Sequence, residues 1–172
     1  MKRIFTFVIV FVMMLSLSAC GEEKVITRED TPETSNETSV SYVFKFGDVE
    51  IPILAKSDEI IAKLGDPISK YEAPSCAFGE MDVVYTYAGV EIGTYQENGE
   101  NFISYVLLKD DTVSTQEGLF IGSERSQVET LYGTPTSSED TSYTYLTDDM
   151  KFVVFFEDDE VTSIEYLNIV LD

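Results

Sequence analysis

The chain has 172 residues, of which 32 are acidic and 11 are basic, so its formal net charge at pH 7 is −21. This balance argues against nucleic acid as a partner, because phosphates require a basic surface. There is no histidine, which excludes Ser-His-Asp and Cys-His nucleophile arrangements and imidazole metal sites. Two cysteines, Cys20 and Cys76, are too few for a thiolate zinc site.

The first 20 residues have the organisation of an export signal. Lys2 and Arg3 precede an uninterrupted apolar run over residues 4–15. That run is shorter than the roughly 20 apolar residues of a transmembrane helix. Leu17-Ser18-Ala19-Cys20 resembles the lipobox of bacterial lipoproteins at every position. The resemblance implies cleavage before Cys20 and a diacylglyceryl group in thioether linkage to its sulfur, with palmitate among the acyl chains of the anchor. A plain signal peptide or an uncleaved anchor is the alternative.

The segment after the signal is too polar to fold. Residues 21–41 are rich in Thr, Ser and Glu, and such a composition buries too little apolar surface to offset the entropy of ordering. We therefore expect a signal peptide over 1–19, and a lipidated Cys20 with a disordered tether over 20–41. The protein would then sit outside the cytoplasm, tethered to the cell membrane, most consistently at a Gram-positive surface. Cys76, left without a cysteine partner, is expected to be a buried, inert thiol.

Two short helices are predicted from a repeated pattern. Residues 57–67 and 123–135 each begin with a serine that could cap a helix, and each ends in glycine followed two positions later by proline. Each is followed by β-branched and aromatic runs separated by turn residues. The predicted strands are 82–87, 90–95 and 102–108 in the first unit and 141–146, 151–156 and 161–167 in the second, with extra strands at 42–46 and 49–53.

These patterns predict an α+β fold of two tandem repeats, 42–114 and 115–172. Each repeat would hold one helix and a three-stranded antiparallel meander, with the helices packed on one sheet face. The stretch Gly118 to Ser123, with Val128, Leu131, Gly133 and Pro135, resembles the β-lactamase-inhibitor-protein-like fold of small outer-membrane assembly lipoproteins. The chain also resembles uncharacterised clostridial lipoproteins, in the runs Ser75-Cys76-Ala77-Phe78 and Leu108-Lys109-Asp110-Asp111-Thr112-Val113. The resemblance implies the tandem α+β arrangement and little about activity; Leu54 stands where the second unit has a glycine-framed segment.

Aromatic side chains on the meanders are the candidate partner-binding surface. Tyr85 and Tyr87 share one face of their strand, and Tyr143 and Tyr145 share the corresponding face in the second unit. Exposed aromatic patches often mark binding sites. The alternative is that these rings form the edge of the core, with their hydroxyls reaching water.

Paired acids occur at predicted turns, at 110–111, 148–149 and 158–160. They could chelate calcium, but none has the alternating order of a dedicated calcium loop. Two carboxylates could also hydrolyse a glycosidic bond without histidine. With 32 acids in the chain, however, a suitable pair would arise by chance and is not informative. No metal site and no cofactor is predicted.

The sequence therefore favours a lipid-anchored, non-enzymatic binding module for a protein or cell-envelope component. Its expected partners are the membrane, through the lipid on Cys20, and an envelope or extracellular protein. The alternatives are a small-molecule or divalent-ion sensor domain and, further off, a carboxylate-based hydrolase.

Overall fold

The computed structural model describes residues 42–75 and 80–169. The predicted signal peptide, the lipidated Cys20, the tether up to residue 41 and Cys76 lie outside the described residues. The described chain belongs to one compact unit, Thr38–Asp172. No helix in residues 42–75 or 80–169 combines the length and apolar content that crossing a membrane requires.

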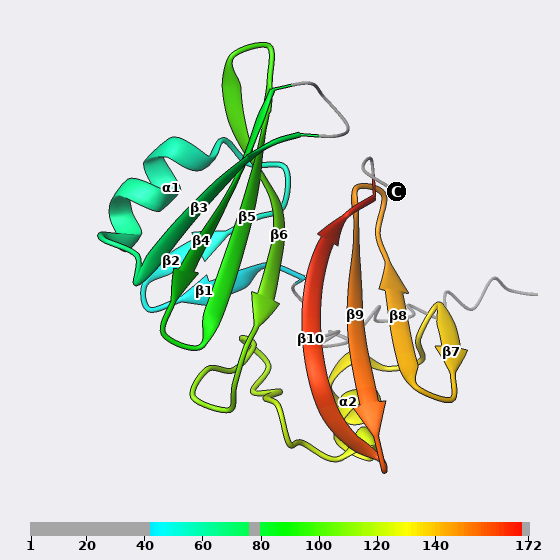
Figure 1. Cartoon of the computed structure of the whole chain (residues 1–172). Coiled ribbons are helices and arrows are strands. Elements are labelled where there is room, and N and C mark those ends of the chain that lie inside the picture. The colour runs from blue at the N-terminus through cyan, green and yellow to red at the C-terminus, as the bar shows by residue number, and fades with distance from the viewer. Residues whose placement is uncertain (1–41, 76–79, 170–172) are drawn as a thin grey trace, which may run out of the picture. The chain divides into compact units, whose positions relative to one another are not determined.

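The described residues form ten strands and two helices (Figure 1). A small hairpin comes first, followed by α1 and four strands, and then by α2 and four more strands. In chain order the elements are β1 (Phe44–Phe46), β2 (Val49–Ile51), α1 (Ser57–Leu64), β3 (Ser69–Pro74), β4 (Met81–Tyr87), β5 (Val90–Glu97), β6 (Glu100–Leu108), α2 (Arg125–Tyr132), β7 (Ser137–Glu139), β8 (Ser142–Leu146), β9 (Met150–Glu157) and β10 (Glu160–Asn168).

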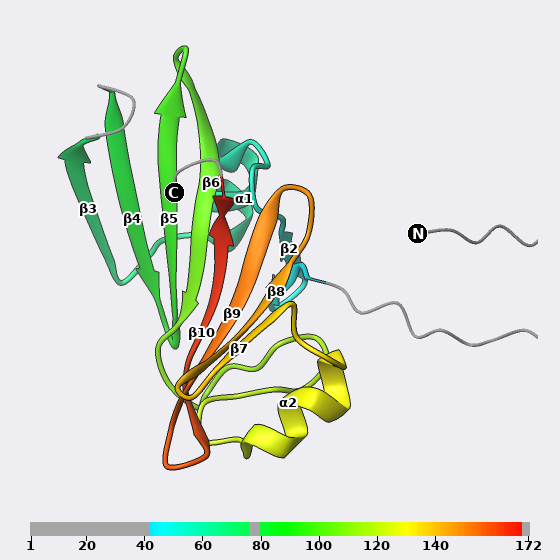
Figure 2. The same ribbon diagram turned by 90° about the vertical axis from the view of Figure 1, so that its right-hand side faces the viewer.

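Eight strands form one antiparallel sheet in the order β3-β4-β5-β6-β10-β9-β8-β7. Two four-stranded meanders therefore meet where β6 pairs with β10, in a register that places Val106 opposite Tyr166. The strands β3 and β7 are the two ends of the sheet, and Figure 2 shows β3 at its outer edge, beside β4.

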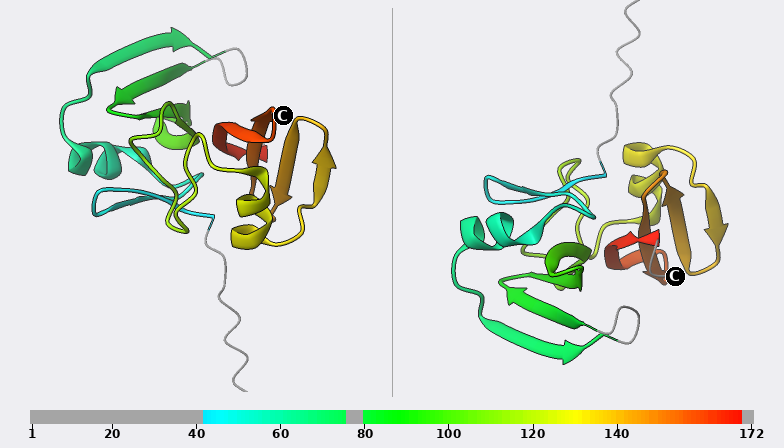
Figure 3. Two further views of the ribbon diagram at one scale, coloured as in Figure 1. Left: turned by 90° about the horizontal axis from the view of Figure 1, so that it is seen from below. Right: turned by 90° about the horizontal axis from the view of Figure 1, so that it is seen from above.

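One face of the sheet carries the hydrophobic core. Register pairs place Val90 against Leu108, Ile92 against Val106, and Tyr166 against Phe152, and all of these side chains are buried. Because side chains alternate across a strand, one register brings this apolar set onto a single face. The hairpin β1–β2 closes part of that face with Phe44 and Ile51, which are 0% and 1% exposed; it lies on the same side of the sheet as α2 (Figure 3).

The predicted α+β class, with helices packed on one sheet face, is wrong. The structure is mostly β, with 51% of the described residues in strands and 14% in helices, and its centre is one eight-stranded sheet rather than two helix-covered repeats. Each helix has only two turns: α1 fully buries Ser57 alone, and α2 buries Val128 and Tyr132. Helices this short form no layer over the sheet, so aromatic side chains and β1–β2 cover much of its core face.

Two strands were missed, so the meanders have four strands rather than three. β3 and β7 have the polar sequences SKYEAP and SSE, and nearly all of their side chains are exposed. An edge strand whose two faces are both exposed to solvent lacks the alternation of apolar and polar residues from which strands are predicted. The predicted boundary at 114/115 falls in the connection between Leu108 and Arg125.

The serines predicted as helix caps, Ser57 and Ser123, do not cap their helices. Neither helix has a side-chain cap, and the N-cap residues are Lys56 and Glu124. Each helix start is instead held by backbone bonds to a sheet strand. Leu54 donates to the Ile103 carbonyl at 2.9 Å, and Gly122 donates to the Val161 carbonyl at 2.8 Å. Leu54 adopts φ +66°, in the positive-φ region that Gly122 also occupies at φ +97°.

Candidate functional site

The four tyrosines predicted as a binding surface face the core. Tyr87, Tyr143 and Tyr145 are only 6%, 7% and 3% exposed, and Tyr85 is half-buried. Their register partners are the core residues Val90, Val154, Phe152 and Ile92, respectively. Pairing opposite a core side chain puts each ring on the core face. Tyr87, Tyr143 and Tyr145 thus belong to the core cluster, and Tyr85 packs against it.

The hydroxyls of three of these tyrosines donate hydrogen bonds to residues in or at the end of the two helices. Tyr87 donates to the carbonyl of Gly65 at 3.3 Å, and Tyr145 donates to the carbonyl of Gly133 at 3.1 Å. Both glycines are the residues that end a helix, with φ near +75°. Tyr143 donates to Glu129 Oε1 at 2.7 Å. Tyr87 and Tyr145 thus make equivalent contacts in the two halves of the sheet.

The most distinctive surface lies where β6 and β9 end and where α2 and β10 begin, at the lower end of Figure 1. Two open grooves of about 540 and 480 Å³ adjoin there and share Asp158 and Glu160. Among the residues that the structure describes, eight acids line them, against one basic side chain, Arg125. We call these acids the acidic face: Asp110, Asp111, Glu124, Glu129, Glu157, Asp158, Asp159 and Glu160.

The tight β9–β10 turn concentrates this charge. Glu157 pairs with Glu160, which leaves a two-residue loop of Asp158 and Asp159 at φ +51° and +65°. Hairpins of this kind usually contain Asn-Gly, and the corresponding β5–β6 turn has Asn98-Gly99. Aspartate tolerates positive φ better than most residues. The second turn therefore keeps the hairpin geometry while adding two carboxylates.

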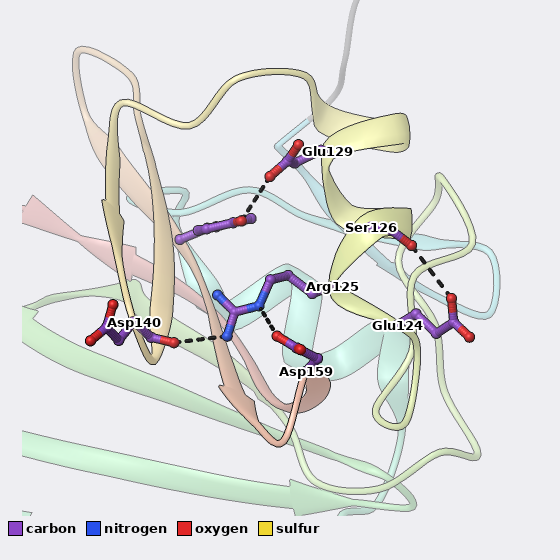
Figure 4. Close-up of polar contacts among 7 residues, drawn as sticks. Glu124, Arg125, Ser126, Glu129, Asp140 and Asp159 are labelled. Atoms are coloured by element: carbon purple, nitrogen blue, oxygen red, sulfur yellow. Dashed lines mark hydrogen bonds and ion pairs between the residues drawn. The ribbon is translucent and has the colours of Figure 1, made fainter.

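Arg125 is already committed to contacts within the protein (Figure 4). Its Nε donates to Asp159 Oδ1 at 2.8 Å, and its Nη2 donates to the backbone carbonyl of Asp140 at 2.7 Å. The guanidinium carbon lies 4.1 Å from the ring centroid of Phe156 and 5.4 Å from that of Tyr143. These contacts tie the first turn of α2 to two hairpin turns, so Arg125 offsets part of the negative charge without being available to an anion.

This surface has the chemistry of a cation-binding face and lacks a chelating set. Within residues 42–75 and 80–169, no three His, Cys, Asp or Glu side chains are grouped so that they could hold a metal ion. The predicted acidic turns 110–111 and 158–160 are brought together here, whereas 148–149 lies on the β8–β9 turn at the opposite end of β9. Arg125 was not singled out from the sequence, because its partners lie 15 and 34 residues away.

Comparison with known proteins gives a likeness of fold only. No known protein family matches the chain, and no curated protein does. The chain is similar to the 1.5 Å crystal structure of an extracellular protein containing an SCP domain from Bacillus anthracis str. Ames, with a TM-score of 0.50 and 13% sequence identity. The match covers 87% of this chain and 50% of that one. The chain thus spans about half the length of the structure it resembles.

Proposed function

We propose that the protein is a lipid-anchored, extracytoplasmic, non-catalytic binding module whose acidic face receives a basic segment of a protein partner. The observation that carries this proposal is the pair of adjoining grooves, which within 42–75 and 80–169 are lined by eight carboxylates and one cation, Arg125. Clefts lined by charge of one sign attract ligands of the opposite sign and orient their approach.

The arrangement of the carboxylates supports a flexible cationic partner rather than a bound ion. The acids are distributed along two open grooves, and the described residues offer no chelating group. A basic peptide carries its charges several ångströms apart, so it can meet such a row of acids one pair at a time. Exposed ion pairs are individually weak, and we expect the binding energy to be the sum over several of them.

The anchor is supported by sequence. Leu17-Ser18-Ala19-Cys20 follows a charged start and an apolar run, and residues 21–41 would hold the acidic face away from the membrane. Cleavage before Cys20 removes Lys2 and Arg3, so the formal charge would fall from −21 to −23. Anionic lipid would repel this strongly acidic unit, so the acidic face would remain accessible to a partner. The extracellular nature of the structurally similar Bacillus protein is consistent with this location.

The direct test uses a lysine-rich peptide as a probe and the full chain in a non-ionic detergent. The variant Glu157→Gln/Glu160→Gln removes two charges from the acidic face, and we expect it to weaken peptide binding about tenfold, or roughly 0.7 kcal/mol for each exposed pair lost. Fluorescence anisotropy of the labelled peptide measures the affinity.

A matched control separates the acidic face from the net charge. Asp148→Asn/Asp149→Asn removes the same two charges from the β8–β9 turn, where both residues are exposed. It should bind the peptide nearly as tightly as the unaltered chain does. Equal weakening by both variants would mean that net charge alone attracts the peptide, and the proposed site would be wrong.

A further inference from the structure

The strand β3 is an open edge of the sheet. No described strand pairs with its outer side, since β3 ends the strand order. Ile68 and Tyr71 lie at this edge and are 73% and 69% exposed, the two most exposed large hydrophobic side chains among the described residues. The opposite edge, β7, has three residues and none of them is apolar. An open strand with exposed apolar side chains is a template for pairing with another strand.

The register of β3 on β4 determines which backbone groups face outward. Ser75 donates to the Glu80 carbonyl at 2.7 Å, and Tyr71 pairs with Val84 in the same register. Hydrogen-bonded pairs alternate along an antiparallel ladder. The N–H and C=O groups of Tyr71 therefore point toward β4, and those of Lys70 and Glu72 point away from the sheet.

We propose that β3 pairs antiparallel with β3 of a second copy, about a two-fold axis at Tyr71. In this register Lys70 of one copy lies opposite Glu72 of the other, and the two residues exchange both of their outward backbone hydrogen bonds. The axis repeats this exchange, giving four hydrogen bonds in all. The pairing joins the two sheets into one continuous sheet, and it does not depend on the acidic face or on the lipid.

The side chains of β3 are self-complementary in this register. Lys70 and Glu72 already form an ion pair within one chain, with Nζ and Oε1 2.5 Å apart. Across the axis each would meet the opposite charge of the second copy, and opposite charges directly across a ladder are favourable. The two exposed Tyr71 rings would lie together on the other face of the sheet, at the closest approach of the strands.

The ends of β3 limit the pairing to this short ladder. The next outward positions are Ile68 and Pro74, which would lie opposite each other. The Ile68 N–H already donates to the Thr86 carbonyl at 2.8 Å, and proline has no N–H. No donor is therefore buried without a partner at either end. Because both copies carry a large negative charge, screening by salt should strengthen the dimer.

Disulfide trapping tests the register. In a Cys20→Ser/Cys76→Ser background, where the introduced residue is the only cysteine, Tyr71→Cys brings two cysteine Cα atoms to about 4.5 Å across the axis, within the range of a disulfide. Mild oxidation of the full chain in detergent should convert most of it to a covalent dimer. Ser69→Cys alone should remain monomeric, since its two copies would be about 13 Å apart along the strands. Ser69→Cys/Ala73→Cys should cross-link again, because those positions face each other.

Charge exchange provides a second readout on uncross-linked protein. Lys70→Glu places four carboxylates around the axis and should raise the dimer dissociation constant about tenfold or more. Lys70→Glu/Glu72→Lys restores the complementarity and should restore the dimer in analytical ultracentrifugation. Equal cross-linking of Tyr71→Cys and Ser69→Cys, or a chain that is monomeric at every salt concentration, would overturn the proposal.

Discussion

At the scale of single residues, the pairing of Gly93 with Tyr105 shows how closely the outer face of the sheet is packed. The two residues are register partners on β5 and β6. A Cβ on residue 93 would lie 2.0 Å from Tyr105 Cε1, because the tyrosine ring covers the glycine. The ring is fixed there by its hydroxyl, which donates to Glu91 Oε1 at 2.9 Å. Burial, together with this carboxylate, raises the pKa of Tyr105 above its ordinary value.

We expect Gly93→Ala to lower the free energy of unfolding by about 2–3 kcal/mol, because the ring must leave its position or the strands must separate. Urea denaturation measures the change. Tyr105→Ser removes the ring. In that background, adding Gly93→Ala should lower the free energy of unfolding much less than it does in the unaltered chain. If alanine were equally harmful with and without the ring, the clash with Tyr105 would not be its cause.

At the scale of elements, each short helix is held by contacts with the sheet rather than by its own caps. The carbonyl of the glycine that ends each helix accepts a hydrogen bond from a tyrosine hydroxyl of the sheet. Tyr87 donates to Gly65, and Tyr145 donates to Gly133. The start of each helix is bonded to a strand through Leu54 and Gly122. Helices of two turns are marginal in isolation, so these contacts determine whether the helices persist.

The two tyrosines offer a matched pair of tests. Tyr87→Phe and Tyr145→Phe each remove one hydroxyl and keep the buried ring, and each should lower the free energy of unfolding by about 1 kcal/mol. The two sites share no partner, so the double variant should lose the sum of the single losses. Amide hydrogen exchange should show faster opening of the adjacent helix only. Faster exchange throughout the sheet would contradict a local fastening role.

The same elements show what the sequence can predict. The apolar strands were recognisable because their β-branched and aromatic residues alternate, and the predicted 82–87 nearly coincides with β4 at 81–87. The edge strands β3 and β7 carry no such pattern and were missed. The alternation of side chains along a strand correctly placed Tyr85 and Tyr87 on one face. It does not tell which face of the sheet is buried. The acidic face joins acids from distant turns with Arg125, and only the pairing of the strands brings them together.

At the scale of the whole described unit, buried tyrosines make stability sensitive to alkali. Burial raises the pKa of Tyr132, Tyr145 and Tyr166 above the ordinary value near 10. The unfolded chain releases these protons first as the pH rises. The stability that they confer is therefore complete below about pH 10 and is lost as the pH rises above it, toward the higher folded-state values.

We expect the free energy of unfolding to fall above pH 10 by about 1.4 kcal/mol per pH unit for each tyrosine kept neutral in the folded protein. Urea denaturation at a series of pH values measures the slope. Tyr166→Phe should reduce that slope by about 1.4 kcal/mol per pH unit, the contribution of one tyrosine. An unchanged free energy across this range would show that these hydroxyls ionise without unfolding.

The measurement that tests the acidic face most directly is the salt dependence of its affinity for the lysine-rich peptide. If the eight carboxylates bind the peptide, the affinity of the full chain should fall steeply with rising salt. Glu157→Gln/Glu160→Gln should show a shallower dependence, and Asp148→Asn/Asp149→Asn should follow the unaltered chain. A salt-independent affinity, or one identical in all three proteins, would contradict recognition of a basic partner at this face.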